Sequence, residues 1–340
     1  MFNEQAIISR IFDENINSTQ RIHVAVSGGA DSMCLLYLVS KITDADIIIH
    51  HVKHNISKNT NEWANFVRAT SESFGFNIEH QYVEHDLHFD SMTNFEAEAR
   101  KKRYEAIFSY MSEEDILLLG HHLDDQVENV LINIFKGRGI NGITSLQEKS
   151  VHDNFILLRP LINTEKKDII TFLNNQGVKF VHDESNDSSD YDRNFIRNKV
   201  IPMLLTRFKP LKNSILSVHK ALTNSKVVME ELINDKISSI SDENGINVFD
   251  YNKLSKETRT EILINLLRRE GCYTYNQKVI KEFISQAENI QKNGGVCLEN
   301  NTYKTKMVIK NGENTFEIIF KKIFLDNKNK KKVFFISKKK

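Results

Sequence analysis

Along the first 200 residues, short apolar runs alternate with segments whose apolar positions recur every three or four residues. The short runs predict strands at 22–26, 46–52, 78–83, 116–120 and 155–158. The segments between them predict helices at 31–41, 61–74, 95–111, 124–135 and 165–176. This alternation is typical of an α/β fold in which helices cover both faces of a parallel, Rossmann-like sheet. Ligands of such sheets bind beyond the carboxyl ends of the strands, where the strand order reverses.

The remainder of the chain changes pattern twice. Pro202 and Pro210 bracket a short stretch, which is typical of a domain junction. Helical patterns follow at 211–240, 256–270 and 276–289. Alternating runs at 303–310 and 315–322 then flank an Asn-Gly pair, which is a strong hairpin signal. We therefore expect a sheet domain at 1–208, a helical domain at 209–292 and a small basic β-rich unit at 293–340.

The total charge says little about partners, because 46 lysines and arginines are balanced by 45 acidic residues. The distribution is more informative, since residues 301–340 contain twelve lysines and only three acidic residues. Such a basic segment suits contact with a polyanion, although a lysine-rich surface is equally typical of a solvated face.

Cysteine usage and hydropathy limit the class of protein. Cys34, Cys272 and Cys297 are far apart and form no Cys-x-x-Cys pair or His/Cys cluster. Their spacing argues against structural zinc, an iron–sulfur cluster and a disulfide framework, and it favours a reducing compartment. Residues 1–15 lack the uninterrupted apolar core of a signal peptide, and no apolar run has the length of a membrane span. We expect a globular, cytoplasmic protein with a full hydrophobic core.

The segment 27–32, Ser-Gly-Gly-Ala-Asp-Ser, joins the first predicted strand to the first predicted helix and indicates a phosphate cradle. Both glycines can take positive φ and lack a Cβ, so backbone N–H groups can converge on an anion at the start of a helix. The two hydroxyls suit phosphate oxygens, and Asp31 can cap the helix or hold Mg²⁺. No Gly-Lys-Ser/Thr follows, so this is not a Walker A loop. The alternative is a plain strand-to-helix turn with a Ser or Asp cap.

Residues 121–128, His-His-Leu-Asp-Asp-Gln-Val-Glu, follow the fourth predicted strand and place acids at the start of a helix. Helical spacing puts Asp124 and Glu128 on one face and leaves Asp125 pointing elsewhere. Paired acids beside a phosphate cradle suit Mg²⁺ or a cationic amine. The alternative is an acid-rich helix start that complements the helix dipole. The two histidines before the acids favour a functional site.

Basic side chains recur at helical spacing. Arg100 and Arg103 share one predicted helix face, and Arg193 and Arg197 share another, an arrangement that suits phosphate groups. Taken alone, each pair is equally typical of a solvated surface. Single basic residues near predicted element ends are His51, His54 and Arg138.

The order of these motifs resembles a known group of proteins. The loop at 27–32 resembles that of the PP-loop ATP pyrophosphatases, which have an adenine nucleotide alpha hydrolase-like fold and include GMP, NAD and asparagine synthetases and tRNA thiolases. The full series is similar to the tRNA(Ile)-lysidine synthetase family within that group. The motifs that carry this similarity are His-Val-x-His at 51–54, Asn-x-Glu-Ala-x-Ala-Arg-x-x-Arg-Tyr at 94–104, His-His-x-Asp-Asp-Gln at 121–126, Arg-Gly at 138–139, Arg-Pro-Leu at 159–161, and Asp-Glu-Ser-Asn followed by Arg-Asn-x-x-Arg at 183–197.

The resemblance implies an enzyme that uses ATP to adenylate the 2-carbonyl oxygen of the wobble cytidine in a CAU-anticodon tRNA(Ile). The ε-amine of free L-lysine then displaces AMP, which is a better leaving group than a carbonyl oxygen. The implied cofactors are ATP and Mg²⁺, and the implied partners are tRNA(Ile) and lysine. No membrane and no obligatory protein partner is implied.

The resemblance also implies roles for single residues. The implied catalytic residues are Asp31, His122, Asp124 and Asp125. The implied ATP-binding residues are Ser27, Gly28, Gly29, Ala30, Asp31, Ser32, His51, Arg100 and Arg103. Mg²⁺ is assigned to Asp31 and Asp125, and tRNA to Arg138, Arg193, Arg197 and the C-terminal lysines. Whether Asp124 or Asp125 binds metal or lysine stays open.

Two other functions also stay open. A tRNA thiolase of the same group would activate the same kind of carbonyl for sulfur, but it generally needs cysteines that carry sulfur or a cluster, and the three isolated ones fit badly. A catalytically silent RNA-binding protein would bind tRNA without releasing AMP and pyrophosphate. That function leaves the joint presence of loop, acids and histidines unexplained.

Overall fold

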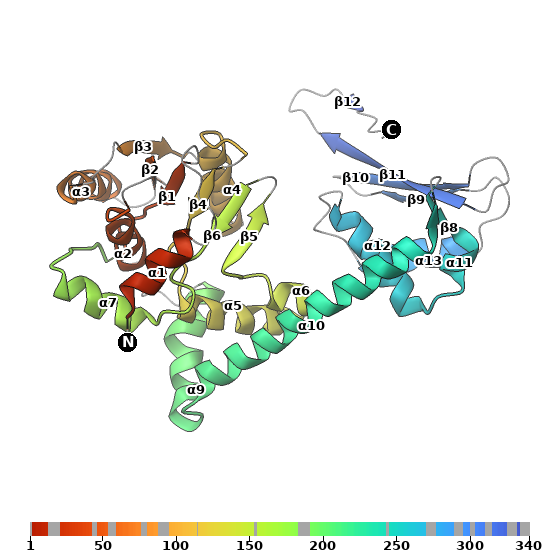
Figure 1. Ribbon diagram of the computed structural model, residues 1–340. Coiled ribbons are helices and arrows are strands. Elements are labelled where there is room, and N and C mark those ends of the chain that lie inside the picture. Colours follow the sequence, from red (N-terminus) through yellow and green to blue (C-terminus); the bar gives the residue numbers. More distant parts are fainter. Residues whose placement is uncertain are drawn as a thin grey trace. The chain divides into compact units, whose positions relative to one another are not determined.

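The protein forms two compact units, Met1–Thr223 and Asn224–Lys340 (Figure 1). The computed structural model describes residues 2–12, 21–42, 46–53, 59–75, 80–87, 95–113, 115–152, 155–182, 191–242, 245–269, 277–288, 295–299, 303–309, 315–324 and 332–333.

In the described part of the first unit, six strands form one sheet in the order β3-β2-β1-β4-β6-β5. The strands are β1 (Ile22–Ala25), β2 (Ile47–Lys53), β3 (His80–Asp86), β4 (Ile116–Leu118), β5 (Lys149–His152) and β6 (Phe155–Leu158). Every pair is parallel except β5 with β6. The chain runs outward from β1 to β3 and returns to the other side of β1 to form β4. The strand order therefore reverses between β1 and β4, where a ligand crevice is expected.

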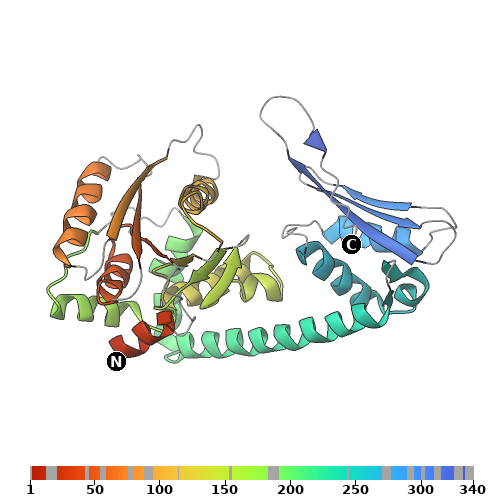
Figure 2. The same cartoon turned by 45° about the horizontal axis from the view of Figure 1, so that its top comes forward.

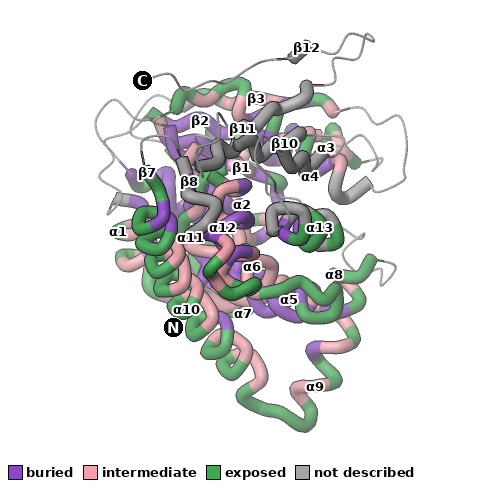
Figure 3. The backbone as a smooth tube through the Cα atoms, turned by 90° about the vertical axis from the view of Figure 1, so that its right-hand side faces the viewer, coloured by how far each residue is buried: buried purple, intermediate pink, exposed green. Residues whose placement is uncertain are grey.

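Helices cover both faces of this sheet, as the α/β pattern predicts. They are α1 (Glu4–Phe12), α2 (Ala30–Val39), α3 (Thr60–Ser73), α4 (Phe95–Phe108), α5 (Leu123–Phe135), α6 (Ile140–Ile143), α7 (Lys166–Asn175), α8 (Asp192–Phe195), the π-helical turn η2 (Ile196–Val200) and α9 (Ile201–Arg207). α1, α2, α3 and α7 share one core with Val24 and Ile49 of the central strands. Ile107 of α4 packs on the other face, against Leu117 and Leu157. Figure 3 shows the resulting burial of α2 and the central strands.

The five predicted strands and five predicted helices of this unit are confirmed, with ends that differ by at most three residues. The elements α1, α6 and β5 were not predicted. β5 is an antiparallel edge strand whose residues are mostly exposed, so it needs no apolar run and leaves no apolar signal in the sequence.

α10 (Leu211–Ser239) begins in the first unit and ends in the second. Most of its residues are exposed (Figure 3). Within the described ranges, no helix combines the length and the apolar character needed to cross a bilayer.

The second unit contains an antiparallel sheet in the order β7-β8-β11-β10-β9, with β12 paired to β11, as far as its described residues go. Its remaining elements are β7 (Ser241–Asp242), β8 (Gly245–Asn247), α11 (Val248–Asn252), α12 (Lys256–Arg269), α13 (Gln277–Glu288), β9 (Gly295–Glu299), β10 (Tyr303–Ile309), β11 (Thr315–Phe324) and β12 (Lys332–Val333). Figure 2 shows the helices of this unit on one side of the sheet.

The predicted hairpin is confirmed in its strands, since Ile309 pairs with Phe316. Its Asn-Gly turn lies outside the described residues, and the strands β7, β8, β9 and β12 were not predicted. Because β8 pairs with β11, this sheet combines strands from the predicted helical segment and the predicted β-rich segment. The boundaries at 208 and 292 stay a prediction.

Three buried histidines lie in line across the first three strands. His23 Nδ1 is 2.7 Å from His50 Nε2, and His50 Nδ1 is 2.8 Å from His85 Nε2. At the other end His23 Nε2 lies 3.1 Å from Asp115 Oδ2. Burial raises the pKa of Asp115, but hydrogen bonds from Arg21 and from the backbone N–H of Ser112, together with the nearby His23, outweigh it and hold that pKa below its ordinary value. This carboxylate therefore accepts from His23. Each ring then donates its Nε2–H toward Asp115, which requires neutral imidazoles along the chain.

This chain of histidines predicts a loss of stability in acid. Burial, reinforced by the two neighbouring rings, lowers the pKa of His50 from 6.5 to about 3. The unfolded chain binds protons below pH 6.5 that the folded chain excludes, so stability is complete above that pH and is lost as the pH falls. For His50 alone we expect the free energy of unfolding to fall by roughly 2 kcal/mol between about pH 7.5 and about pH 5.

Urea titrations followed by the fluorescence of Trp63, the single tryptophan, measure this effect in the first unit. The variant His50→Gln should show a shallower pH dependence than the wild type, whereas exposed His152→Gln should not. Equal pH dependence in all three proteins would contradict the assignment.

Candidate active site

The loop between β1 and α2 is folded around the hydroxyl of Ser32. Ser32 Oγ accepts hydrogen bonds from the backbone N–H groups of Ser27 and Gly28, each at 3.2 Å, and donates to Gly29 O at 2.9 Å. Gly28 has φ +94°, and a Cβ there would lie 3.2 Å from Val67 Cγ2. Gly29 has an ordinary φ of −72°, so the expected positive φ is confirmed for Gly28 alone. The loop is thus preformed at the start of α2, where unpaired helix N–H groups favour anions.

The end of β4 passes close to the start of α2 at Gly120. A Cβ at Gly120 would lie 3.1 Å from the carbonyl carbon of Asp31 and 3.1 Å from the backbone nitrogen of Ser32. This absence of a side chain lets the two chain segments approach, and it brings His122 toward the loop at the reversal point of the sheet.

We expect Gly120→Ala to displace the start of α2. Because both obstructing atoms belong to backbone, the strain cannot be relieved by a side-chain rotation, and we expect a loss of roughly 1–3 kcal/mol in stability. Thermal unfolding measures the loss of stability, and the Kd for ATP measures the effect of the displaced start of α2. Gly139→Ala is the matched control, since its φ is −66° and a Cβ there meets nothing within 4 Å. Unchanged ATP affinity in Gly120→Ala would mean that the close approach of Gly120 to the start of α2 does not shape the ATP-binding loop.

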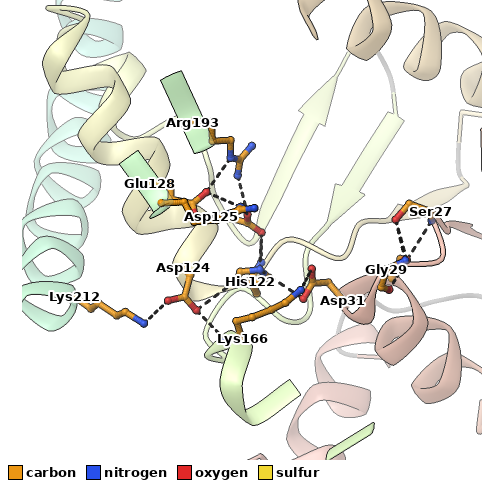
Figure 4. Close-up of polar contacts among 12 residues, drawn as sticks. Ser27, Gly29, Asp31, His122, Asp124, Asp125, Glu128, Lys166, Arg193 and Lys212 are labelled. Atoms are coloured by element: carbon orange, nitrogen blue, oxygen red, sulfur yellow. Dashed lines mark hydrogen bonds and ion pairs between the residues drawn. The ribbon is translucent and has the colours of Figure 1, made fainter. Parts of the chain in front are cut away.

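Asp31 points across the crevice between β1 and β4 (Figure 4). Its Oδ2 lies 2.6 Å from Lys166 Nζ, and its Oδ1 is buried without a hydrogen-bond partner, 3.6 Å from His122 Nε2. α2 has no side-chain cap, and its N-cap residue is Gly29. The capping alternative for Asp31 is therefore wrong, and this carboxylate is directed toward a ligand position.

His122 lies among three carboxylates. Its side chain is 5% exposed, and Nε2 lies 3.4 Å from Asp125 Oδ2 while Nδ1 lies 3.6 Å from Asp124 Oδ2. The backbone N–H of His122 donates to Asp125 Oδ2 at 2.9 Å, which fixes the start of α5. The preceding His121 is half-buried, and desolvation lowers its pKa to about 3. An imidazole between carboxylates is placed to accept or hold a proton.

The acidic side chains of α5 have different partners from those that the predicted helix face implies. Asp124 turns toward α7 and α10, where its Oδ2 accepts from Lys166 N at 2.9 Å and its Oδ1 pairs with Lys212 Nζ. Asp125 and Glu128 instead share partners. The predicted pairing of Asp124 with Glu128 on one face is wrong, because Arg193 of α8 and Arg197 of η2 approach α5 from the side of Asp125 and Glu128.

Arg193 and Arg197 lie against the pair Asp125 and Glu128. Arg193 Nη2 is 2.8 Å from Asp125 Oδ1, and Arg193 Nε is 2.9 Å from Glu128 Oε2. Arg197 Nε is 2.6 Å from Glu128 Oε1, and its Nη2 is 3.3 Å from Asp125 Oδ1. Burial raises the pKa of Asp125, but His122 and Arg193 outweigh it and bring that pKa to about 2. Asp125 is therefore ionised throughout the physiological range.

The residues present fit Mg²⁺ at Asp31. Mg²⁺ in nucleotide sites is usually held by one or two carboxylates together with substrate phosphates and water. Asp31 Oδ1 is a buried oxygen without a hydrogen-bond partner beside the loop. Both oxygens of Asp125 already accept hydrogen bonds from His122 N and Arg193. Asp31 is therefore the better donor of the two predicted ligands. Within the described residues, no three or more His, Cys, Asp or Glu side chains form a group that could hold a metal ion.

The other predicted site residues lie around this crevice. His51 is buried on β2, and its Nδ1–H donates to Val26 O at 2.8 Å, so it supports the residue that precedes the loop.

Arg100 lies on α4 with its guanidinium 5.2 Å above the Tyr104 ring, and Arg103 follows on the same helix. Arg138 is exposed beyond α5 and bonds Asn133 Oδ1 at 3.3 Å. Binding of ATP by Arg100 and Arg103 and of tRNA by Arg138 stays a prediction. The motif residues His54, Asn94 and 183–186 lie outside the described residues.

The sequence motifs missed two charged residues of the site. Lys166 reaches Asp31 from the first turn of α7, and Lys212 reaches Asp124 from α10. Lysines are common on surfaces, and neither lysine lies in a motif. The sheet topology alone brings Lys166 to Asp31, which is 135 positions away.

Comparisons with known proteins agree with this geometry. A model of the PP-loop domain matches residues 3–204. A tRNA(Ile)-lysidine synthase of Haemophilus ducreyi is 31% identical over 242 residues, which cover 71% of this chain and 55% of that protein. A tRNA(Ile)-lysidine synthase of Actinobacillus pleuropneumoniae is 28% identical over 271 residues, or 79% of this chain and 64% of that protein. This chain therefore spans between about half and two thirds of the length of these relatives.

Among solved structures, a U34-tRNA thiolase from Methanococcus maripaludis that carries a [4Fe-4S] cluster superposes with a TM-score of 0.53 at 17% identity. The match covers 64% of this chain and 77% of that chain, and it supports the fold alone. Because the PP-loop domain model matches more than half of the residues and its loop lies at the reversal point of the sheet, the chain belongs to the PP-loop domain family.

Proposed function

We propose that the protein is a tRNA(Ile)-lysidine synthase, which joins lysine to carbon 2 of the wobble cytidine of CAU-anticodon tRNA(Ile) and converts ATP to AMP and pyrophosphate. The observation that carries the proposal is the meeting of Asp31 and His122, 3.6 Å apart, beside the preformed loop of β1. The names of the two relatives above support the choice of substrate.

In the first step the loop holds the β- and γ-phosphates of ATP. The 2-carbonyl oxygen of cytidine attacks the α-phosphorus, and the bond from that phosphorus to the pyrophosphate oxygen breaks. Mg²⁺ held by Asp31 would neutralise charge on the departing pyrophosphate. Lys166 lies within hydrogen-bond distance of Asp31 and supplies a second positive charge at the same place.

In the second step the ε-amine of lysine attacks carbon 2, forming the C–N bond as the C–O bond breaks and AMP leaves. The ammonium must lose a proton first, and His122 lies where it can accept one. The crevice already holds two ammonium groups of the chain itself, Lys166 on Asp31 and Lys212 on Asp124. Its carboxylates are therefore suited to a lysine amine, and we assign free lysine to Asp124, where its ammonium group would take the place of Lys212 Nζ.

The assignment of Arg193 and Arg197 to tRNA requires a change in their ion pairs. Both guanidinium groups pair with Asp125 and Glu128, so a contact with RNA phosphate requires that at least one of these ion pairs opens. Arg138 is exposed and meets no such requirement.

The thiolase alternative finds less support in the described residues. Cys34 is fully buried in α2, and burial raises the pKa of its thiol far above the ordinary value. A buried thiol of this kind cannot serve as a sulfur-carrying thiolate.

Incubation of the protein with ATP, CAU-anticodon tRNA(Ile) and labelled lysine tests the proposal. We expect lysine label in the tRNA in equal amount to the AMP released. Transfer of label from a sulfur donor, with none from lysine, would overturn the proposal in favour of thiolation.

A further inference from the structure

An apolar ridge of α5 continues beyond the elements that cover it. Val127 and Leu131 are buried against Ile196 and Ile201. One turn later Phe135, on the same ridge, is 63% exposed. Leaving an aromatic ring in water sacrifices the stabilisation of its burial, so an exposed ridge end beside a functional site indicates a partner.

Two further exposed aromatic residues come from the start of α8. This start lies beside the end of α5, since Lys136 Nζ is 2.9 Å from Asp192 Oδ2. Tyr191 and Phe195 flank Asp192 in the sequence and are 46% and 49% exposed. The N–H of Phe195 donates to Tyr191 O at 2.9 Å, so the two residues are one helical turn apart. Figure 3 shows α8 on the exposed surface of the first unit.

We propose that Phe135, Tyr191 and Phe195 form a stacking surface for unpaired bases of the RNA strand that enters the active site. This inference rests on the proposed function. It goes beyond the proposed function because it assigns the recognition of the unpaired bases beside the reacting base to three aromatic side chains for which the sequence motifs imply no role.

The surroundings of the rings favour RNA over a protein partner. Lys136, Arg138 and Lys199 are exposed next to the rings, with Asp192 as their acidic neighbour. Aromatic rings interleaved with cations are the usual composition of surfaces that bind single-stranded nucleic acid, where each ring stacks on a base and the cations follow the backbone.

The position of the surface suits the same strand. α5 runs from Asp124 in the crevice to Phe135 on the surface, about 16 Å along the helix axis. An extended RNA strand covers that distance with a few nucleotides. Arg193 lies between Tyr191 and Phe195 in the sequence and binds Asp125 and Glu128. These ion pairs connect the helix that carries Phe195 to the acids of α5.

The test measures the affinity of the full-length protein for a stem-loop RNA with the CAU anticodon and for a fully paired duplex of similar length. Phe195→Ala and Phe135→Ala should each weaken stem-loop binding about five- to one-hundred-fold and leave duplex binding unchanged. Phe195→Trp should retain binding, because stacking needs only an aromatic face. Phe208→Ala is the matched control and should bind like the wild type, because Phe208 is a comparably exposed phenylalanine that follows α9.

Three results would overturn the inference: stem-loop affinities within about twofold of wild type in both alanine variants, equal losses for stem-loop and duplex, or a change of oligomeric state in place of RNA affinity. Thermal unfolding of each variant identifies a loss caused by misfolding, in which case Phe195→Leu replaces Phe195→Ala. The outcome is separable from that of the proposed function, because stem-loop binding needs neither ATP nor lysine.

Discussion

Asp31→Asn is expected to lower the rate of pyrophosphate release from ATP at least about one-hundred-fold, while the protein stays folded. The carboxylate is the only described acid directed at the loop with a buried oxygen that lacks a hydrogen-bond partner. An amide keeps the size of the side chain but removes the charge that holds Mg²⁺ and Lys166. Pre-steady-state measurement of pyrophosphate release, with ATP and tRNA saturating, separates this loss from a change in affinity.

The control for this variant is Asp46→Asn, since Asp46 is exposed and precedes β2, at the end of the parallel strands opposite the loop. Lys166→Ala provides a second comparison and should also slow pyrophosphate release, by a smaller factor, because it removes a charge that Mg²⁺ can partly replace. If Asp31→Asn released pyrophosphate at the wild-type rate, the loop would have no role in ATP cleavage.

Glu128→Gln is expected to destabilise the first unit by about 3 kcal/mol. The side chain of Glu128 is 1% exposed and binds Arg193 Nε and Arg197 Nε. Removing its charge leaves two guanidinium groups with Asp125 as their remaining acidic partner. Arg193 and Arg197 are 29% and 35% exposed, so water screens part of the lost attraction. We therefore expect a destabilisation at the lower end of the usual range for buried ion pairs.

Urea unfolding followed by Trp63 fluorescence measures this change, and a double-mutant cycle with Arg197→Gln isolates the pair. The double variant should be less destabilised than the sum of the single variants. The surface pair of Lys136 and Asp192 is the control, and Asp192→Asn should cost less than about 1 kcal/mol. Equal costs for Glu128→Gln and Asp192→Asn would mean that the buried network contributes no more than a surface ion pair.

The fold was predictable from sequence to the extent that burial dictates residue type. The run at 47–49 is apolar at every position because β2 is buried on both faces, and it predicted the strand to within one residue. β5 was missed because an exposed edge strand places no such demand on its residues.

The sequence motifs predicted residues of the site, but not which of its charged side chains pair with one another. Helical spacing allows Glu128 to lie near Asp124, four positions away, or near Asp125, three positions away. The prediction took the first pairing, and the structure has the second. The choice depends on Arg193 and Arg197, whose approach is fixed by α8 and η2. Lys166 was missed for the same reason, since its role follows from a contact made only when α7 packs beside α2.

The most direct test of adenylation uses ATP labelled at the α-phosphate, with CAU-anticodon tRNA(Ile) and no lysine. We expect the label to move onto the tRNA with release of pyrophosphate, and subsequent addition of unlabelled lysine to return it as AMP. Release of ADP and inorganic phosphate, with no label on the tRNA at any time, would contradict the proposed function.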